Sequence, residues 1–233
     1  MKVFLYTFSK QYNRDLSVDM IPLGIEVIEL DSRELFFENL RKHSDVVSLV
    51  TEYPDIELHH EIRTIRPDIR VTLIVHQNIK PSDLIKLSHF GIHHILNYVE
   101  NSTTMAEEIL KSILTDQLRV REKRLHVRVQ PKSLDKIQGA IFIREVKKFF
   151  KGIIIDISAG GFAIRLSDSL EASSLVVGHT YEPVLLSIIG NEIKTMSTLV
   201  VKRNDIAGFK FDNVEAKYMK RISEYIYMRL KGY

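Results

Sequence analysis

The first 118 residues alternate short apolar runs with segments of helical spacing. Five runs have the length and composition of strands, several of them apolar throughout as in a buried parallel sheet: residues 2–8, 25–30, 45–51, 70–76 and 93–98. Helical patterns cover residues 33–43, 55–67, 81–91 and 103–118, with Pro81 near one expected start and Gly91 near the matching end. Strands that alternate with helices are joined by right-handed crossovers, so this segment predicts a three-layer α/β domain.

The pattern changes near residue 119, where helical spacing gives way to short β-type runs. The runs cover residues 139–146, 150–157, 162–166, 182–189, 191–203 and 207–214. Gly190-Asn191 and Asn204-Asp205 are turn candidates between neighbouring runs. Many short strands with close turns predict a small antiparallel barrel. The last segment places Met219, Ile222, Ile226 and Leu230 on one helical face, which we expect to lie across the barrel. The expected domains are therefore residues 1–118 and 119–233.

The two halves differ in charge. Residues 1–118 hold 12 Lys/Arg and 18 Asp/Glu, net −6, whereas residues 119–233 hold 21 and 12, net +9. A basic C-terminal half suits a phosphate-bearing ligand, a nucleic acid or an acidic protein surface, and charge alone does not choose among them.

The composition also limits the class of protein. The chain has no cysteine, which excludes disulfides and thiolate metal sites and fits a reducing cytoplasm. Its start has no long apolar core or small-residue cleavage site, and no run approaches the length of a membrane span, so we expect a cytoplasmic protein.

A dense basic segment lies at the start of the second half. Residues 119–128, RVREKRLHVR, hold five Lys/Arg and one Glu, with Arg124 and Arg128 four residues apart. Such density is typical of a solvated linker or a nonspecific acidic-partner patch. Arginine forks also suit bidentate contacts with phosphate and with the N7/O6 edge of guanine, so this arm could bind a guanine nucleotide.

A polar, glycine-containing segment lies between two apolar runs further along the chain. Asp156, Ser158, Gly160 and Gly161 stand in DISAGG. Asp and Ser bond local backbone N–H groups and Gly accepts positive φ, so a self-bonded turn is one interpretation. A ligand site is the other, and it needs cations from elsewhere in the chain, which the arm supplies.

Together these two segments resemble the PilZ family of bacterial cyclic di-GMP receptors. The family signature is an Arg-x-x-x-Arg arm followed by Asp/Asn-x-Ser-x-x-Gly, and RLHVR and DISAGG match it in order. Gly178, the AGFKF run at 207–211 and the closing helix are further family-like features, and the resemblance covers about residues 119–231. It implies a six-stranded antiparallel barrel with a C-terminal helix.

The resemblance also implies a role for each site residue. Arg124 and Arg128 would hold the phosphates and guanine edges of cyclic di-GMP, and Asp156 would accept from a guanine N1 or N2 donor. Ser158 would bond a phosphate or a base. Gly160 and Gly161 would let the backbone approach the ligand.

The first half resembles the receiver domain of two-component response regulators over roughly residues 1–118. Receivers carry an acidic pair after the first strand, an acceptor aspartate at the end of the third and a lysine after the fifth. Here those places hold Thr7-Phe8-Ser9, Val50-Thr51 and Asn97-Tyr98-Val99. Nothing in these stretches would hold Mg²⁺ or accept a phosphoryl group, so the resemblance implies a pseudo-receiver.

The expected function is a cyclic di-GMP receptor that converts ligand binding into domain rearrangement or docking of a protein partner through the N-terminal domain. A PilZ domain that binds no ligand and acts as a protein adaptor is one alternative, and a nucleic-acid-binding regulator is another, which lacks an aromatic stacking platform or recognition helix. The sequence leaves the oligomeric state open, including a homo-oligomer.

We do not expect a catalytic site in this chain. The pairs His59-His60 and His93-His94 have no suitably spaced carboxylate to complete a metal site. The sequence contains no phosphate-loop glycine motif, serine elbow or paired-acid site. We therefore expect no enzyme, no metal and no cofactor other than the ligand.

Overall fold

The computed structural model describes residues 1–76, 89, 92–115, 126–135 and 137–232. The chain divides into two compact units, Met1–Arg124 and Leu125–Tyr233. The predicted boundary after residue 118 falls in a segment outside the described residues, so its position stays a prediction. The helix expected over 81–91, with Pro81 and Gly91, also lies outside them apart from residue 89.

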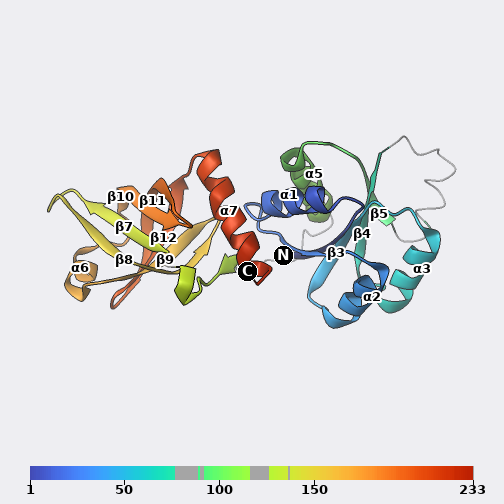
Figure 1. Ribbon diagram of the computed structural model, residues 1–233, viewed down its shortest axis with the longest axis horizontal. Coiled ribbons are helices and arrows are strands. Elements are labelled where there is room, and N and C mark those ends of the chain that lie inside the picture. Colours follow the sequence, from blue (N-terminus) through green and yellow to red (C-terminus); the bar gives the residue numbers. More distant parts are fainter. Residues whose placement is uncertain (77–88, 90–91, 116–125, 136, 233) are drawn as a thin grey trace. The chain divides into compact units, whose positions relative to one another are not determined.

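The N-terminal unit is built on a five-stranded parallel sheet (Figure 1). Its strands are β1 (Lys2–Tyr6), β2 (Glu26–Glu29), β3 (Val46–Thr51), β4 (Arg70–Val75) and β5 (Ile92–Asn97). The strand order is β2-β1-β3-β4-β5, which is the order of flavodoxin-like and receiver domains. The five predicted strands and the parallel α/β fold are confirmed.

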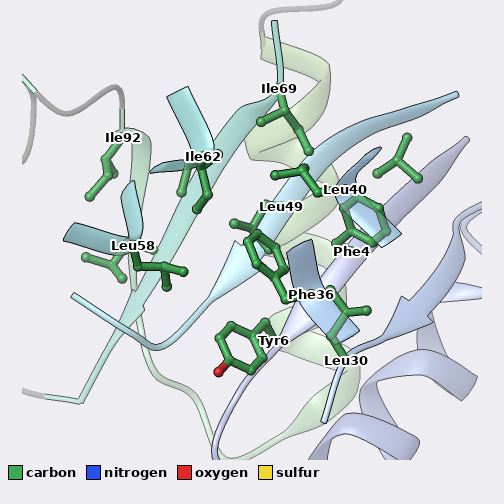
Figure 2. Packing of buried hydrophobic residues seen from close by; sticks show 13 residues of the cluster. Phe4, Tyr6, Leu30, Phe36, Leu40, Leu49, Leu58, Ile62, Ile69 and Ile92 are labelled. Carbon is green, nitrogen blue, oxygen red and sulfur yellow. The ribbon is translucent and has the colours of Figure 1, made fainter. Parts of the chain in front are cut away.

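Alternation along the central strand explains the two cores of this unit. Val3 and Leu5 of β1 lie in a core that contains residues of α1 (Lys10–Met20) and α5 (Ser102–Thr115). Phe4 and Tyr6 point to the opposite face, where α2 (Arg33–Lys42) and α3 (Ile56–Ile65) contribute Phe36, Leu40, Leu58 and Ile62 (Figure 2). Successive strand side chains point to opposite faces, so a strand covered by helices on both sides is apolar throughout.

Helix α1 was not predicted from the sequence, where residues 10–20 show no helical pattern of apolar residues, and the structure corrects this. Polar residues stand at buried positions of that helix: Asn13 and Ser17 are each 2% exposed. Their polar atoms are satisfied, because Asn13 accepts a hydrogen bond from Thr7 and Ser17 donates one to Glu29 at 2.7 Å. Ser9 caps the helix by accepting from the Tyr12 N–H. The buried face is therefore too polar to show an apolar helical period.

The C-terminal unit is a closed antiparallel barrel of six strands with a helix against it. The strands are β7 (Gln138–Ile143), β8 (Lys148–Ser158), β9 (Gly161–Leu166), β10 (Thr180–Ile188), β11 (Asn191–Arg203) and β12 (Ile206–Asn213). The ring runs β8-β7-β10-β11-β12-β9 and closes because β8 also pairs with β9. The predicted barrel is confirmed.

Two hairpins of the barrel have turns of the kind that their residue types favour. Ile189 and Gly190 both have positive φ, 47° and 71°, between the paired residues Ile188 and Asn191. A two-residue turn with positive φ at both positions fits the twist of an antiparallel pair. The hairpin is confirmed, with its turn one residue earlier than the Gly190-Asn191 signal. Asn204 and Asp205 form the other predicted turn, and Asn204 has a φ of 51°.

The closing helix α7 (Ala216–Leu230) contacts β6, β8 and β10 of the barrel, where β6 is the two-residue strand Arg128–Val129. Ile222 and Ile226 of the predicted apolar face are fully buried, whereas Leu230 at the helix end is 37% exposed. Two short helices, η1 (Ser133–Asp135) and α6 (Ser169–Ser174), complete the unit. No helix in the described part of the chain is both long and apolar enough to cross a membrane.

Candidate ligand-binding site

The turn between β8 and β9 is tighter than the sequence suggested. Ser158 and Gly161 are paired across the two strands, so only Ala159 and Gly160 lie in the turn. Asp156 and Ser158 are therefore strand residues of β8, not turn residues. Ser158 is 3% exposed and its hydroxyl donates to the Gly161 carbonyl oxygen at 3.2 Å. This hydrogen bond is the local one that the self-bonded interpretation expects.

The two glycines allow close approach of neighbouring groups. A Cβ on Gly161 would lie 2.1 Å from the carbonyl oxygen of Phe209 in β12, a backbone atom. A Cβ on Gly160 would lie 2.2 Å from the His126 ring, which stands between the two arginines of the arm in the sequence. Gly161 thus permits the barrel to close, and Gly160 permits the end of the arm to lie on the turn.

Arg128 and Asp156 are brought together by strand pairing. Arg128 in β6 is paired with Ser158 at the end of β8. The strand β6 lies along the same edge of β8 as β7, which pairs with the earlier residues of β8. Nη1 of Arg128 lies 3.8 Å from Oδ1 of Asp156, with side chains 55% and 28% exposed. An exposed ion pair of this kind contributes at most about 1 kcal/mol, so a ligand can replace it at little cost. Arg124 lies outside the described residues.

A β-bulge turns Asp156 toward the outer face of the barrel. The register of β8 and β9 shifts between Ile154 and Asp156, which leaves Ile155 as an extra residue. In a regular strand Asp156, two positions after Ile154, would share the inward face of Ile154, which is 1% exposed. Bulges re-aim side chains in this way and are frequent beside functional sites.

A pocket of about 320 Å³ lies beside Arg128 and Asp156. This volume is at the lower end of the range of about 300–1,000 Å³ that small-molecule sites occupy. It is lined by Arg128, Ile155, Asp156, Phe162, Ala163, Val200, Val201, Arg203, Ile206, Gly208 and Phe209. Gly160, Gly161 and the buried Ser158 do not line it.

The β11 side of this pocket is formed by Val200, Val201 and Arg203, which were not predicted from the sequence. The sequence gives no clear signal for them, because apolar and polar residues do not alternate regularly along this run. In the run these residues read as ordinary strand positions. Only the strand order β11-β12-β9-β8 brings them to the same pocket as Asp156.

The carboxyl edge of the N-terminal sheet carries a second group of polar residues. Glu52 directly follows β3, and its carboxylate accepts from the Phe8 N–H at 2.9 Å and contacts His76 Nε2 at 2.8 Å. The Glu52 side chain is only 3% exposed, and the rings of Phe8 and Tyr53 contact each other in a tilted arrangement with centroids 4.3 Å apart. The sequence analysis had considered Thr51 but not Glu52. Within the described residues no three His, Asp or Glu side chains could hold a metal ion together.

Known proteins are similar to each half of the chain. Residues 121–228 match the family model of the PilZ domain. The chain is similar to the PilZ domain of YcgR from Escherichia coli, a structure that contains c-di-GMP, with 14% identity, a TM-score of 0.42, and coverage of 48% of this chain and 93% of that one. No curated protein matches the chain.

The chain is also similar to a signal receiver domain from Clostridium thermocellum, with 11% identity, a TM-score of 0.41, and coverage of 48% and 96% of the two chains. A response regulator from Thermotoga maritima matches with 16% identity, a TM-score of 0.42, and coverage of 48% and 97%. The family model confirms the PilZ resemblance, and the sheet order of the N-terminal unit makes that unit receiver-like.

Proposed function

Because residues 121–228 form a PilZ domain and a receiver-like domain precedes it, we propose that the protein is a receptor for cyclic di-GMP. The observation that carries the proposal is the Arg128–Asp156 pair at the rim of the pocket. It joins one residue from each half of the two-part signature. A cation and a carboxylate side by side match the phosphate and the N1/N2 donors of a guanine nucleotide.

Each signature residue has a role in this proposal. Arg124 and Arg128 bind the phosphates and guanine edges, and Asp156 accepts from a guanine N1 or N2 donor. Gly160 carries no side chain at the turn, so that the ligand and the arm can approach it, and Gly161 allows the close contact of β9 with Phe209 of β12. Ser158 is buried and already donates to Gly161, so we assign it to holding the turn rather than to direct contact.

The energies show why the arm and the barrel have to act together. Two charge-assisted arginine contacts contribute about 3–6 kcal/mol. Fixing a five-residue arm on the ligand costs about 5–10 kcal/mol. Micromolar binding needs about −8 kcal/mol, so the difference has to come from Asp156, from stacking of an arginine on a guanine ring and from burial in the pocket.

The position of the arm in the sequence suggests how binding is transmitted. Residues 119–128 connect α5 of the receiver-like domain to β6 of the PilZ domain. A ligand that fixes this segment also restricts how the two domains are held, and the receiver-like domain then serves as the docking surface for a protein partner. We propose that binding involves no chemical step and no cofactor and takes place in the cytoplasm.

Isothermal titration calorimetry with cyclic di-GMP on wild type, Arg128→Ala and Asp156→Ala tests the proposal. We expect each substitution to weaken binding by about tenfold or more, which is about 1.4 kcal/mol. Glu192→Ala removes an exposed carboxylate that does not line the pocket and serves as the control. No binding by the wild type would favour the adaptor alternative, and binding that survives both substitutions would reject this site.

A further inference from the structure

Arg203 lies on the β11 side of the pocket, away from the two-part signature. It is exposed and lines the pocket together with Val200 and Val201. No ion pair or side-chain hydrogen bond joins it to another residue in the described part of the chain. Its guanidinium is therefore available to an anion that enters the pocket.

A second β-bulge points this side of the pocket outward. The register of β11 and β12 shifts between Leu199 and Val201. Buried and exposed positions alternate along β11 up to Leu199, which is fully buried, and then Val200 and Val201 are 51% and 47% exposed. The extra residue reverses the phase of the strand, so that Val201 and Arg203 face outward instead of into the barrel.

Small residues form the floor between the two bulges. Strand register places Asp156 opposite Ala163, Ala163 opposite Gly208, and Gly208 opposite Val201. This row crosses β8, β9, β12 and β11, so Asp156 and Val201 stand three strand spacings apart, about 14 Å. A Cβ on Gly208 would lie 2.6 Å from Cγ1 of Val201. Position 208 therefore has no room for a side chain, because the Val201 side chain lies against it.

The charges at the two sides of the row complement a ligand with two phosphates. Arg128 stands on β6 beyond Asp156, and Arg203 stands on β11 beyond the floor. The strands that carry these two arginines are separated by β8, β9 and β12, so their side chains approach the pocket from opposite sides. A cyclic dinucleotide carries one phosphate on each half, and a purine ring is flat enough to lie on a floor of Ala and Gly.

We propose that Arg203 is a third arginine of the ligand site, which binds the phosphate on the far side of the pocket from Arg128, while a purine ring lies over Ala163 and Gly208 against Val201. This inference rests on the proposed function and deepens it. It assigns a binding role to a residue outside both signature segments. Both bulges then have the same effect, which is to turn ligand-binding side chains to the outer face of the barrel.

Calorimetric titration of the full chain with cyclic di-GMP tests the role of Arg203. The variants are Arg203→Ala, Arg203→Gln and Arg203→Lys, with Arg165→Ala as the matched control. Arg165 is an exposed arginine of β9, which is separated from β11 by β12; it does not line the pocket and pairs with Asp205 at 3.5 Å. Thermal melting of each variant checks that the barrel is folded.

We expect Arg203→Ala and Arg203→Gln to raise the Kd about tenfold or more. Arg203→Lys should raise it less than these variants, because lysine keeps the charge but loses the bidentate fork, and Arg165→Ala should leave it unchanged. Wild-type affinity in Arg203→Ala, together with lost affinity in Arg128→Ala, would overturn the inference and leave the proposed function standing. A lysine variant as weak as the alanine variant would overturn the phosphate assignment. No binding by the wild type would reject both proposals.

Discussion

The two adjacent glycines of the site differ in what a methyl group would meet. At Gly161 the obstacle is the Phe209 carbonyl oxygen, which cannot move without opening the β9–β12 pair, whereas at Gly160 it is the His126 ring, which can rotate. We expect Gly161→Ala to lower the free energy of unfolding by about 2–3 kcal/mol and Gly160→Ala by less than 1 kcal/mol. Urea denaturation of both variants measures this, and equal effects would contradict the geometry.

His59 makes the N-terminal unit sensitive to pH. Its side chain is fully buried in α3, Nε2 contacts the Tyr53 carbonyl oxygen at 3.0 Å, and Nδ1 has no hydrogen-bond partner among the described residues. Burial lowers the pKa of His59 below its usual value. The unfolded chain therefore binds a proton at a higher pH than the folded chain, and stability falls as the pH drops below about 6.5.

Urea denaturation between pH 7.5 and 5.5 measures this effect. Wild type should lose about 1 kcal/mol per pH unit below about pH 6.5 from this group. His59→Gln should flatten that dependence, and His60→Gln, an exposed neighbour on the same helix, should keep it. A His59→Gln variant with the pH dependence of wild type would show that the buried imidazole is not the titrating group.

The Asp135 carboxylate of η1 connects this short helix to the closing helix α7. Asp135 accepts from the Tyr225 hydroxyl at 2.7 Å and from the Lys132 N–H at 2.9 Å, and it lies 3.5 Å from Nε of Arg229. Burial acts to raise the pKa of Asp135, but the hydrogen bonds and the cation outweigh it and hold the pKa below its usual value. The Asp135 carboxylate is therefore charged at neutral pH.

Removing this carboxylate should loosen the closing helix. We expect Asp135→Ala to lower the free energy of unfolding by about 2–3 kcal/mol, since the buried Tyr225 hydroxyl loses its acceptor. Asp168→Ala, which removes the cap of the short helix α6, should cost only about 1 kcal/mol. The comparison uses denaturation curves, and a smaller effect for Asp135→Ala than for Asp168→Ala would contradict this role of Asp135.

Elements whose burial is apolar could be predicted from the sequence, and elements whose burial is polar could not. The five parallel strands and the barrel strands show up as apolar runs because both faces or alternate faces meet a core. Helix α1 was missed because Asn13 and Ser17 occupy its buried face. Both bulges were also invisible, since an extra residue in a strand depends on which partner it pairs with.

The same limit applies to the site. Arg128 could be singled out because it lies in a dense basic segment. Asp156 and the glycines could be singled out because they form a polar segment between two apolar runs. Arg203 stands 47 positions after Asp156 and reaches the pocket only through the order of four strands. Glu52 could not be singled out, because its partners Phe8 and His76 are distant in sequence and meet it only at the edge of the folded sheet.

For the whole molecule, the proposal connects ligand binding to the relation between the domains. Fixing residues 119–128 on cyclic di-GMP should change the distribution of domain arrangements, which small-angle X-ray scattering can measure. We expect the scattering profile to change on saturation with ligand in wild type and to stay unchanged in Asp156→Ala. Superimposable wild-type profiles with and without bound ligand would contradict transmission through the arm.

The most direct test of the central claim is calorimetric titration of the unmodified full chain with cyclic di-GMP, with GTP as the comparison nucleotide. The account predicts saturable binding with a Kd near or below about 1 μM for cyclic di-GMP and far weaker binding of GTP. Binding of cyclic di-GMP weaker than about 1 mM, or no better than that of GTP, would contradict it.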